Sequence, residues 1–207
     1  MDTLTAILGS ETKVKMLRLF LFNPETPFFA NEIARRTKSS SSSVRKELET
    51  LAAIDILKKR VVSKDAPRKH PGHVSAKRIR GLGYILNPHF PHLEALRNLL
   101  IISSVSADAT LAKRFAGVGR LKVVIAAGVF IQNWDSRVDL LLVGEGLNLH
   151  KIESVIRDIE AEIGKEIAYS AFETADFEYR MGIHDRLVRD IIDSPHTTLL
   201  DRLGIEP

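Results

Sequence analysis

Hydrophobic side chains recur at helical spacing in successive segments near the start of the chain. Val14, Leu17 and Leu21 share one face of a helix that we expect from Ser10 to Phe22, with Ser10 at its N-cap. A second helix is predicted from about Phe29 to Arg36. The two segments together indicate a helical start to the protein.

A third helix is predicted where the chain carries a run of serines from Ser39 to Ser43. Taken alone, this run could be a flexible linker. However, Val44, Leu48 and Leu51 follow it at i, i+4 and i+7, so a helix must begin near Ser40. Serine is a good N-cap and does little harm in a first turn. The predicted order is helix, helix, tight turn, helix.

The periodicity then changes to that of β-strands. Residues 57–63 and 75–86 predict two strands, and the polar stretch between them is rich in proline and basic residues. Two strands joined by a long basic loop, after a three-helix unit, are typical of a winged helix. We therefore expect a winged-helix domain over residues 1–88.

A linker helix over residues 89–105 is predicted next, followed by a second domain over residues 106–207. That domain alternates between the two periodicities, which indicates a small α/β domain. Its expected helices are Ala107–Ala116, Leu149–Ile163, Thr174–Met181 and Asp185–Ile192, and its expected strands are Leu121–Ala127, Val138–Val143, Glu166–Phe172 and Thr197–Leu200. The fold class is thus mixed α+β, an N-terminal winged helix-turn-helix plus a small α/β domain.

The composition is that of a globular protein, with 44% hydrophobic and 27% charged residues and no cysteine. The lack of cysteine excludes disulfides and thiolate metal sites, and it fits a reducing compartment. No apolar run approaches the roughly 20 residues that span a bilayer, and the first residues do not form a secretory signal. These features predict a cytoplasmic protein with no membrane contact.

Charge is distributed unevenly along the chain. Residues 1–80 contain 17 lysines and arginines against 8 acids, a net charge of +9, whereas residues 81–207 contain 13 against 18, a net charge of −5. A basic half beside an acidic half suggests that only the first half meets a polyanion.

The third helix and the hairpin supply the residue types that bind DNA. Burial of the apolar stripe leaves Ser42, Arg45, Lys46 and Glu49 on the opposite or flanking face, where short polar and basic side chains can reach base edges in the major groove. The hairpin adds the cationic density that phosphate contacts require. A solvated basic face is the alternative. The residues expected at double-stranded DNA are Ser39, Ser40, Ser42, Ser43, Arg45, Lys46, Lys58, Arg60, Lys64, Arg68, Lys69, Lys77 and Arg78.

Residues Leu8 to Leu57 resemble the winged helix of many bacterial and archaeal regulators. The resemblance lies in the sequence Asn31-Glu32-Ile33-Ala34-Arg35-Arg36, the turn after it and the serine-rich helix start. It implies a transcriptional repressor or activator that works as a homodimer on a two-fold-symmetric site.

From Asn87 onward the chain is similar to prokaryotic regulators in which a winged helix is fused to a minimal nucleotidyltransferase domain. The matching landmarks are Asn87-Pro88 leading into Pro91–Leu96, a strand that ends at Gly128, Ser136–Gly144 and Asp185–Ile192. The resemblance covers nearly the whole chain, and it implies that the second domain is nucleotidyltransferase-like.

Active members of that family have Gly-Ser after the first strand and an Asp-x-Asp pair on the next, whose carboxylates bind Mg²⁺. Here Val129 follows Gly128, Arg137 occupies the first aspartate position, and only Asp139 remains. The segment 167–172, where a third acid often lies, has none. One carboxylate beside a guanidinium cannot assemble two such cations, so we expect no catalysis, no metal and no cofactor.

The role of the relic site, formed by Gly128, Arg137 and Asp139, stays open. Because alternate residues of a strand face the same side, Arg137 and Asp139 would point the same way and could pair with each other or with a ligand phosphate. The domain is then either a dimerisation module or a sensor for an anionic small-molecule effector. The rival hypotheses are a divergent nucleotidyltransferase that uses the winged helix to dock its substrate, and a toxin–antitoxin component.

Overall fold

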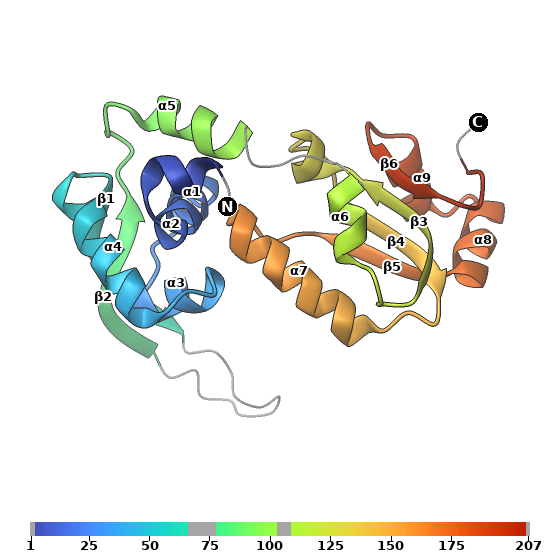
Figure 1. The fold of residues 1–207 in the computed structure, drawn as a ribbon, viewed down its shortest axis with the longest axis horizontal. Helices are drawn as coiled ribbons and strands as arrows, with labels where there is room; N and C mark the ends of the chain where they lie inside the picture. Colours follow the sequence, from blue (N-terminus) through green and yellow to red (C-terminus); the bar gives the residue numbers. More distant parts are fainter. Residues whose placement is uncertain (1–2, 66–77, 103–108, 206–207) are drawn as a thin grey trace. The chain divides into compact units, whose positions relative to one another are not determined.

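The protein has mixed α/β structure with two β-sheets (Figure 1). The structure is a computed structural model that describes residues 3–65, 78–102 and 109–205. The chain divides into two compact units, residues 1–100 and residues 101–207. Each unit has its own sheet and its own buried apolar core.

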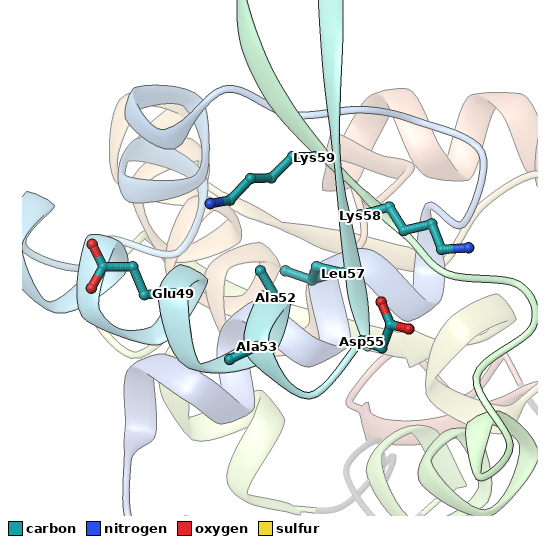
Figure 2. Close-up of a pocket in the computed structure, with 7 residues that line it drawn as sticks. All are labelled: Glu49, Ala52, Ala53, Asp55, Leu57, Lys58 and Lys59. Carbon is teal, nitrogen blue, oxygen red and sulfur yellow. The ribbon is translucent and has the colours of Figure 1, made fainter.

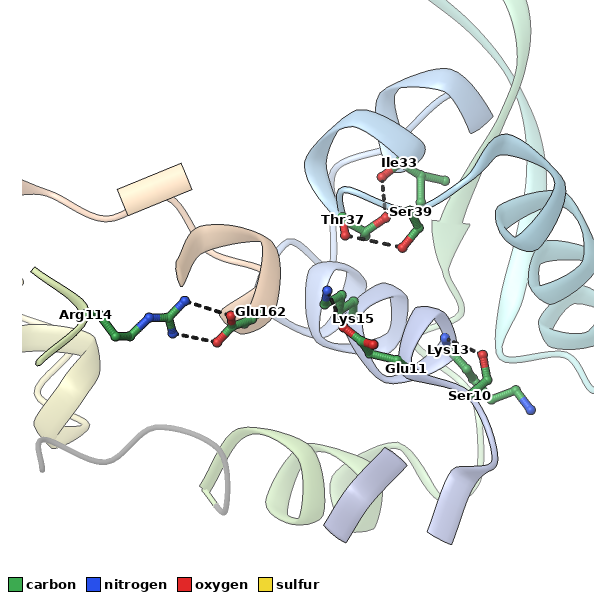
Figure 3. Close-up of polar contacts among 9 residues, drawn as sticks. All are labelled: Ser10, Glu11, Lys13, Lys15, Ile33, Thr37, Ser39, Arg114 and Glu162. Atoms are coloured by element: carbon green, nitrogen blue, oxygen red, sulfur yellow. Dashed lines mark hydrogen bonds and ion pairs between the residues drawn. The ribbon is translucent and has the colours of Figure 1, made fainter. Parts of the chain in front are cut away.

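Helices open the first unit: α1 (Thr3–Leu8), α2 (Glu11–Phe22), α3 (Ala30–Arg36) and α4 (Ser41–Ala53). Helices α2 to α4 confirm the three predicted helices, whereas α1 was not predicted. Ser10 caps α2 as expected, because its Oγ accepts a hydrogen bond from the Lys13 N–H (Figure 3). One turn into α2, the Lys15 ammonium lies 2.6 Å from the Glu11 carboxylate, and this contact lowers the pKa of Glu11.

A β-hairpin follows the helices of the first unit. Strands β1 (Leu57–Asp65) and β2 (Arg78–Leu86) pair antiparallel from Leu57 opposite Leu86 to Asp65 opposite Arg78. The chain between α2 and α3 joins this hairpin through a β-bridge from Phe28 to Tyr84. Phe28 is buried and makes an edge-to-face contact with Phe20 of α2, with ring centroids 5.6 Å apart. This contact ties the helices to the hairpin.

The predicted linker helix begins as α5 (Leu93–Arg97) and continues as a π-helix (Asn98–Ile102). The buried Arg18 of α2 donates from Nε to the Leu100 carbonyl at 3.2 Å. The segment up to Leu100 therefore belongs to the first unit. Residues 103–105 of the predicted linker lie outside the described residues.

The second unit is built on a sheet with strand order β5-β4-β3-β6. Strand β3 (Arg120–Ala126) pairs antiparallel with both β4 (Leu140–Glu145) and β6 (Thr197–Asp201), whereas β5 (Tyr169–Glu173) runs parallel to β4. Helix α7 (Leu149–Ile163) makes the crossover between the two parallel strands. Its observed bounds are those predicted from the sequence.

Helices cover both faces of this sheet. Helices α8 (Thr174–Gly182) and α9 (Arg186–Ile192) bury Phe177, Val188 and Ile191 against β3 and β4. Helices α6 (Ala109–Arg114) and α7 lie on the other side (Figure 1). A bidentate ion pair joins them, since the two terminal guanidinium nitrogens of Arg114 each lie 2.7 Å from a carboxylate oxygen of Glu162 (Figure 3).

The structure differs from the sequence prediction at the starts of two strands. Strand β4 begins at Leu140 rather than Val138, and β5 begins at Tyr169 rather than Glu166. The chain after β3 forms a 3₁₀ turn, Gly128–Ile131, where a loop was expected. None of the helices in the part of the chain that the structure describes is both long and apolar enough to cross a membrane.

Replacing Gly83 with alanine is expected to lower the free energy of unfolding of the first unit by about 1–3 kcal/mol. The new Cβ would lie 2.8 Å from Val62 Cγ2 and 3.3 Å from the Phe28 carbonyl oxygen. These distances are shorter than van der Waals contact, so the hairpin or the Phe28 backbone would have to shift. Urea unfolding followed by circular dichroism measures the change. Gly182→Ala is the control, because its Cβ meets nothing within 4 Å. Equal stability of the two variants would contradict the close approach at Gly83.

Candidate functional site

Helix α4 buries one face and exposes the other. Val44, Leu48 and Leu51 are at most 1% exposed. Ser42, Arg45, Lys46 and Glu49 are exposed, as the spacing predicts. Glu47, at the boundary between the faces, is buried and lies 3.5 Å from the Lys13 ammonium of α2. The ion pair and the apolar stripe together fix which side of α4 meets solvent.

The serines at the start of α4 divide into two groups. Ser40 is the N-cap: its Oγ accepts from the Ser43 N–H at 3.1 Å and lies 2.8 Å from Ser43 Oγ. Ser39 is half-buried and donates to the Thr37 carbonyl, while Thr37 in turn donates to Ile33 (Figure 3). Ser39 is thus the more buried of these serines, whereas Ser40 and Ser42 are exposed, with their Oγ atoms 3.0 Å apart.

The basic residues of the hairpin extend the exposed charge. Lys58, Lys59, Arg60 and Arg80 are exposed on the paired strands. Lys64 lies opposite Ile79, and Arg78 lies opposite Asp65, in the ladder of β1 and β2. The remaining hairpin residues expected at DNA, namely Arg68, Lys69 and Lys77, lie outside the described residues.

A hollow of about 540 Å³ separates the last turns of α4 from β1 (Figure 2). It is lined by Glu49, Ala52, Ala53, Asp55, Leu57, Lys58 and Lys59. Figure 2 shows the Lys59 side chain reaching toward the α4 side of this hollow and the Lys58 side chain pointing away from it. The two lysines belong to β1, whereas Glu49 belongs to α4 and Asp55 to the turn after it, so the cationic part of the surface lies on the β1 side of the hollow.

The sequence analysis missed an exposed apolar pair on the hairpin. Val61 and Leu82 are register partners, and they are 61% and 51% exposed. Exposed apolar side chains directly opposite each other, among lysines and arginines, form a small apolar surface within a cationic hairpin. Hydrophobic alternation could not identify the pair, because the register depends on the length of the loop that joins the strands.

In the second unit, Asp139 is buried just before β4 and links the chain after β3 to the chain before β5. Its Oδ1 accepts from the Val129 N–H at 2.7 Å and its Oδ2 accepts from the Ala168 N–H at 2.9 Å. Its backbone N–H donates to Ala168, and its carbonyl accepts from Ala127. The carboxylate therefore accepts hydrogen bonds from two backbone segments, one after β3 and one before β5.

Gly128 makes room for this carboxylate. Its φ of +51° lies in the left-handed region that favours glycine, and a Cβ at this position would overlap the Asp139 carboxylate. Two members of the predicted relic site thus lie together, but they do so in a closed, hydrogen-bonded arrangement.

The expectation that Arg137 and Asp139 point the same way and can pair is wrong. Arg137 is exposed and lies 3.2 Å from Asp190 of α9, whereas Asp139 is buried. Strand alternation does not apply to these residues, because β4 begins only at Leu140 and the Ser136 hydroxyl bonds the Val138 carbonyl in the preceding turn.

Lys165 is a further residue that the sequence analysis missed. Its ammonium lies 3.8 Å from Asp139 Oδ1 and 5.6 Å from the ring centroid of Trp134, which is 52% exposed. Lys165 follows the C-cap of α7, so no local pattern links it to either partner. The lysine gives the buried carboxylate a partly exposed cationic neighbour.

This geometry offers little to a metal ion. The two oxygens of Asp139 already accept backbone hydrogen bonds. Among residues 3–65, 78–102 and 109–205 there is no group of three or more His, Cys, Asp or Glu side chains placed to hold a metal.

Replacing Asp139 with asparagine is expected to lower the free energy of unfolding of the second unit by about 1–3 kcal/mol. The amide can accept only one of the two backbone hydrogen bonds, and its NH₂ group would face the other N–H. Thermal denaturation measures the loss. Asp135→Asn, an exposed carboxyl on the same connection, is the control and should change stability little. If Asp139→Asn stabilised the unit, the result would indicate that the carboxylate destabilises the fold and is kept in that position to bind a ligand.

Comparison with known proteins adds no assignment to either unit. The chain matches no family model, no curated protein and no solved structure.

Proposed function

We propose that the protein is a regulator of transcription that binds double-stranded DNA through its first unit. The observation that carries this proposal is the exposed Ser42, Arg45 and Lys46 face of α4 beside the cationic strands of the hairpin. In this proposal the first unit is a winged helix and α4 is its recognition helix.

The order of elements supports the winged-helix assignment. Helices α2, α3 and α4 are followed by the hairpin of β1 and β2, and the α2–α3 connection adds its bridge at Phe28. The turn between α3 and α4 is tight, with Lys38 at a φ of +49°. This is the order that places a second helix, reached through a short turn, in the major groove and a hairpin beside it.

The chemistry of the exposed face suits a duplex. A major groove admits an α-helix, and arginine or lysine can donate to guanine edges while serine can contact several bases. Lys58, Lys59 and Arg60 on β1 would then bind phosphate oxygens, which position the protein without reading sequence. The net charge of +9 over residues 1–80 favours this partner.

The second unit is proposed to be nucleotidyltransferase-like and without transferase activity. Two features support this assignment. The sheet is mixed, with the parallel crossover β4–α7–β5, and Asp139 stands alone where the resemblance implies a pair of metal-binding aspartates. The burial of Asp139 under backbone hydrogen bonds supports a structural role for the residue that the resemblance makes a metal ligand. In the regulator this unit dimerises the protein or senses a ligand.

Charge reversal at Lys46 is expected to weaken specific DNA binding by about 1–3 kcal/mol while leaving the fold intact. The operator is first identified by genome-wide capture of bound DNA, and affinity is then measured by fluorescence anisotropy. Lys113→Glu is the matched control, because it changes the net charge equally at an exposed position on α6.

Two results would contradict the assigned face. One is an equal affinity of Lys46→Glu and Lys113→Glu for the operator. The other is the absence of duplex binding by the unmodified chain even at low ionic strength, which would remove the proposed function altogether.

Lys58→Ala and Arg60→Ala should each reduce the slope of log affinity against log salt concentration by about 1, uniformly across DNA sequences. Both side chains are exposed on β1 and would contact phosphates rather than bases. Binding isotherms at several salt concentrations, with operator and random duplexes, measure the slope. A loss confined to the operator would assign these residues to base contacts instead.

A further inference from the structure

A second group of charged side chains lies between the β3–β4 connection and α9. It surrounds a hollow of about 240 Å³. Its charged lining residues are Asp135, Arg137, Arg186 and Asp190. Neither Gly128 nor Asp139 lines it. The hollow therefore shares Arg137 with the relic site predicted from the sequence, but not Gly128 or Asp139.

Two arginines from different elements converge on one carboxylate oxygen in this hollow. Arg137 lies 3.2 Å and Arg186 lies 3.9 Å from Asp190 Oδ2. The side chains of the two arginines are 65% and 80% exposed, and that of Asp190 is 39% exposed. Ion pairs this exposed contribute little to stability, so an anion from solution can compete with Asp190 for both guanidinium groups.

The arginines have more donors than Asp190 can accept. Each guanidinium carries five N–H groups in a planar fork. Within the part of the chain that the structure describes, Asp190 is the only recorded partner of either guanidinium. The backbone N–H groups at the start of α9 are not available as alternatives, because Asp185 accepts from Leu187 and Val188. A second oxyanion could therefore bind between Arg137 and Arg186.

We propose that this hollow binds the phosphate group of a small metabolite, and that Asp190 occupies the guanidinium groups when the ligand is absent. Arginine pairs suit phosphate because their donors match its oxygens in a bidentate geometry. The volume is below the roughly 300–1,000 Å³ of pockets that hold drug-sized ligands, so the ligand is small.

The hollow also contains charges that oppose an anion. Asp190 competes for the same guanidinium donors, and the exposed Asp135 lies on the rim. Binding in the unmodified protein should therefore be weak, in the millimolar range. Removing the Asp190 charge should free both arginines and tighten phosphate binding, so the proposal predicts the direction of the change in affinity.

The test is equilibrium dialysis of the full chain against radiolabelled inorganic phosphate at constant ionic strength. Asp190→Asn should bind phosphate at least fivefold more tightly than the unmodified protein. Asp193→Asn is its matched control, because it removes the same charge from an exposed site near the end of α9 that pairs with Arg189 outside the hollow. Phosphate bound by the basic first unit is the same in all these variants, so only the differences count.

A second comparison uses the arginines. Arg186→Gln should abolish the component that Asp190→Asn strengthens, while Arg189→Gln on the same helix should leave it unchanged. Equal affinities of Asp190→Asn and Asp193→Asn would overturn the proposal. So would an equal loss in Arg186→Gln and Arg189→Gln, which would indicate a response to net charge alone.

Discussion

The burial of one apolar stripe on α4 is the constraint on which the proposed function depends. Val44, Leu48 and Leu51 can leave water only if the helix turns Ser42, Arg45 and Lys46 outward. The Ser40 cap sets where the helix begins and so which serines fall in its first turn. Packing and capping, together with the Lys13–Glu47 ion pair, therefore decide which polar side chains are exposed, and the charge of those side chains decides what they bind.

The Asp139 carboxylate shows how a buried charge is accommodated within the second unit. At its position the resemblance implies a metal ligand, yet the carboxylate is buried and both of its oxygens accept backbone N–H groups. A buried carboxylate with two such donors is stable without a cation, because the hydrogen bonds replace its hydration. Gly128 belongs to the same arrangement, since any side chain there would overlap Asp139.

Local sequence patterns predicted the helices and strands, but they did not predict contacts between residues that are distant in the sequence. Helix α7 was found at both ends because an amphipathic repeat lies between the Asn148 cap and Gly164. The Arg137–Asp139 expectation failed because strand alternation was extended beyond the first residue of β4. Arg137 pairs with Asp190, and Asp139 lies near Lys165. Each of these contacts joins residues far apart in the sequence, and no periodicity predicts such contacts. The Val61–Leu82 pair likewise needed the hairpin register.

The two proposed sites place different demands on charge. A duplex is a long polyanion, so its partner needs many exposed cations over a wide surface, and net charge is informative. A single phosphate group needs only a few donors in the right geometry. Screening limits the effect of more distant acids to about 10 Å at ordinary salt concentrations. The net charge of −5 over residues 81–207 thus does not argue against an anion between Arg137 and Arg186. What limits that site is its own Asp190, one carboxylate that two arginines share.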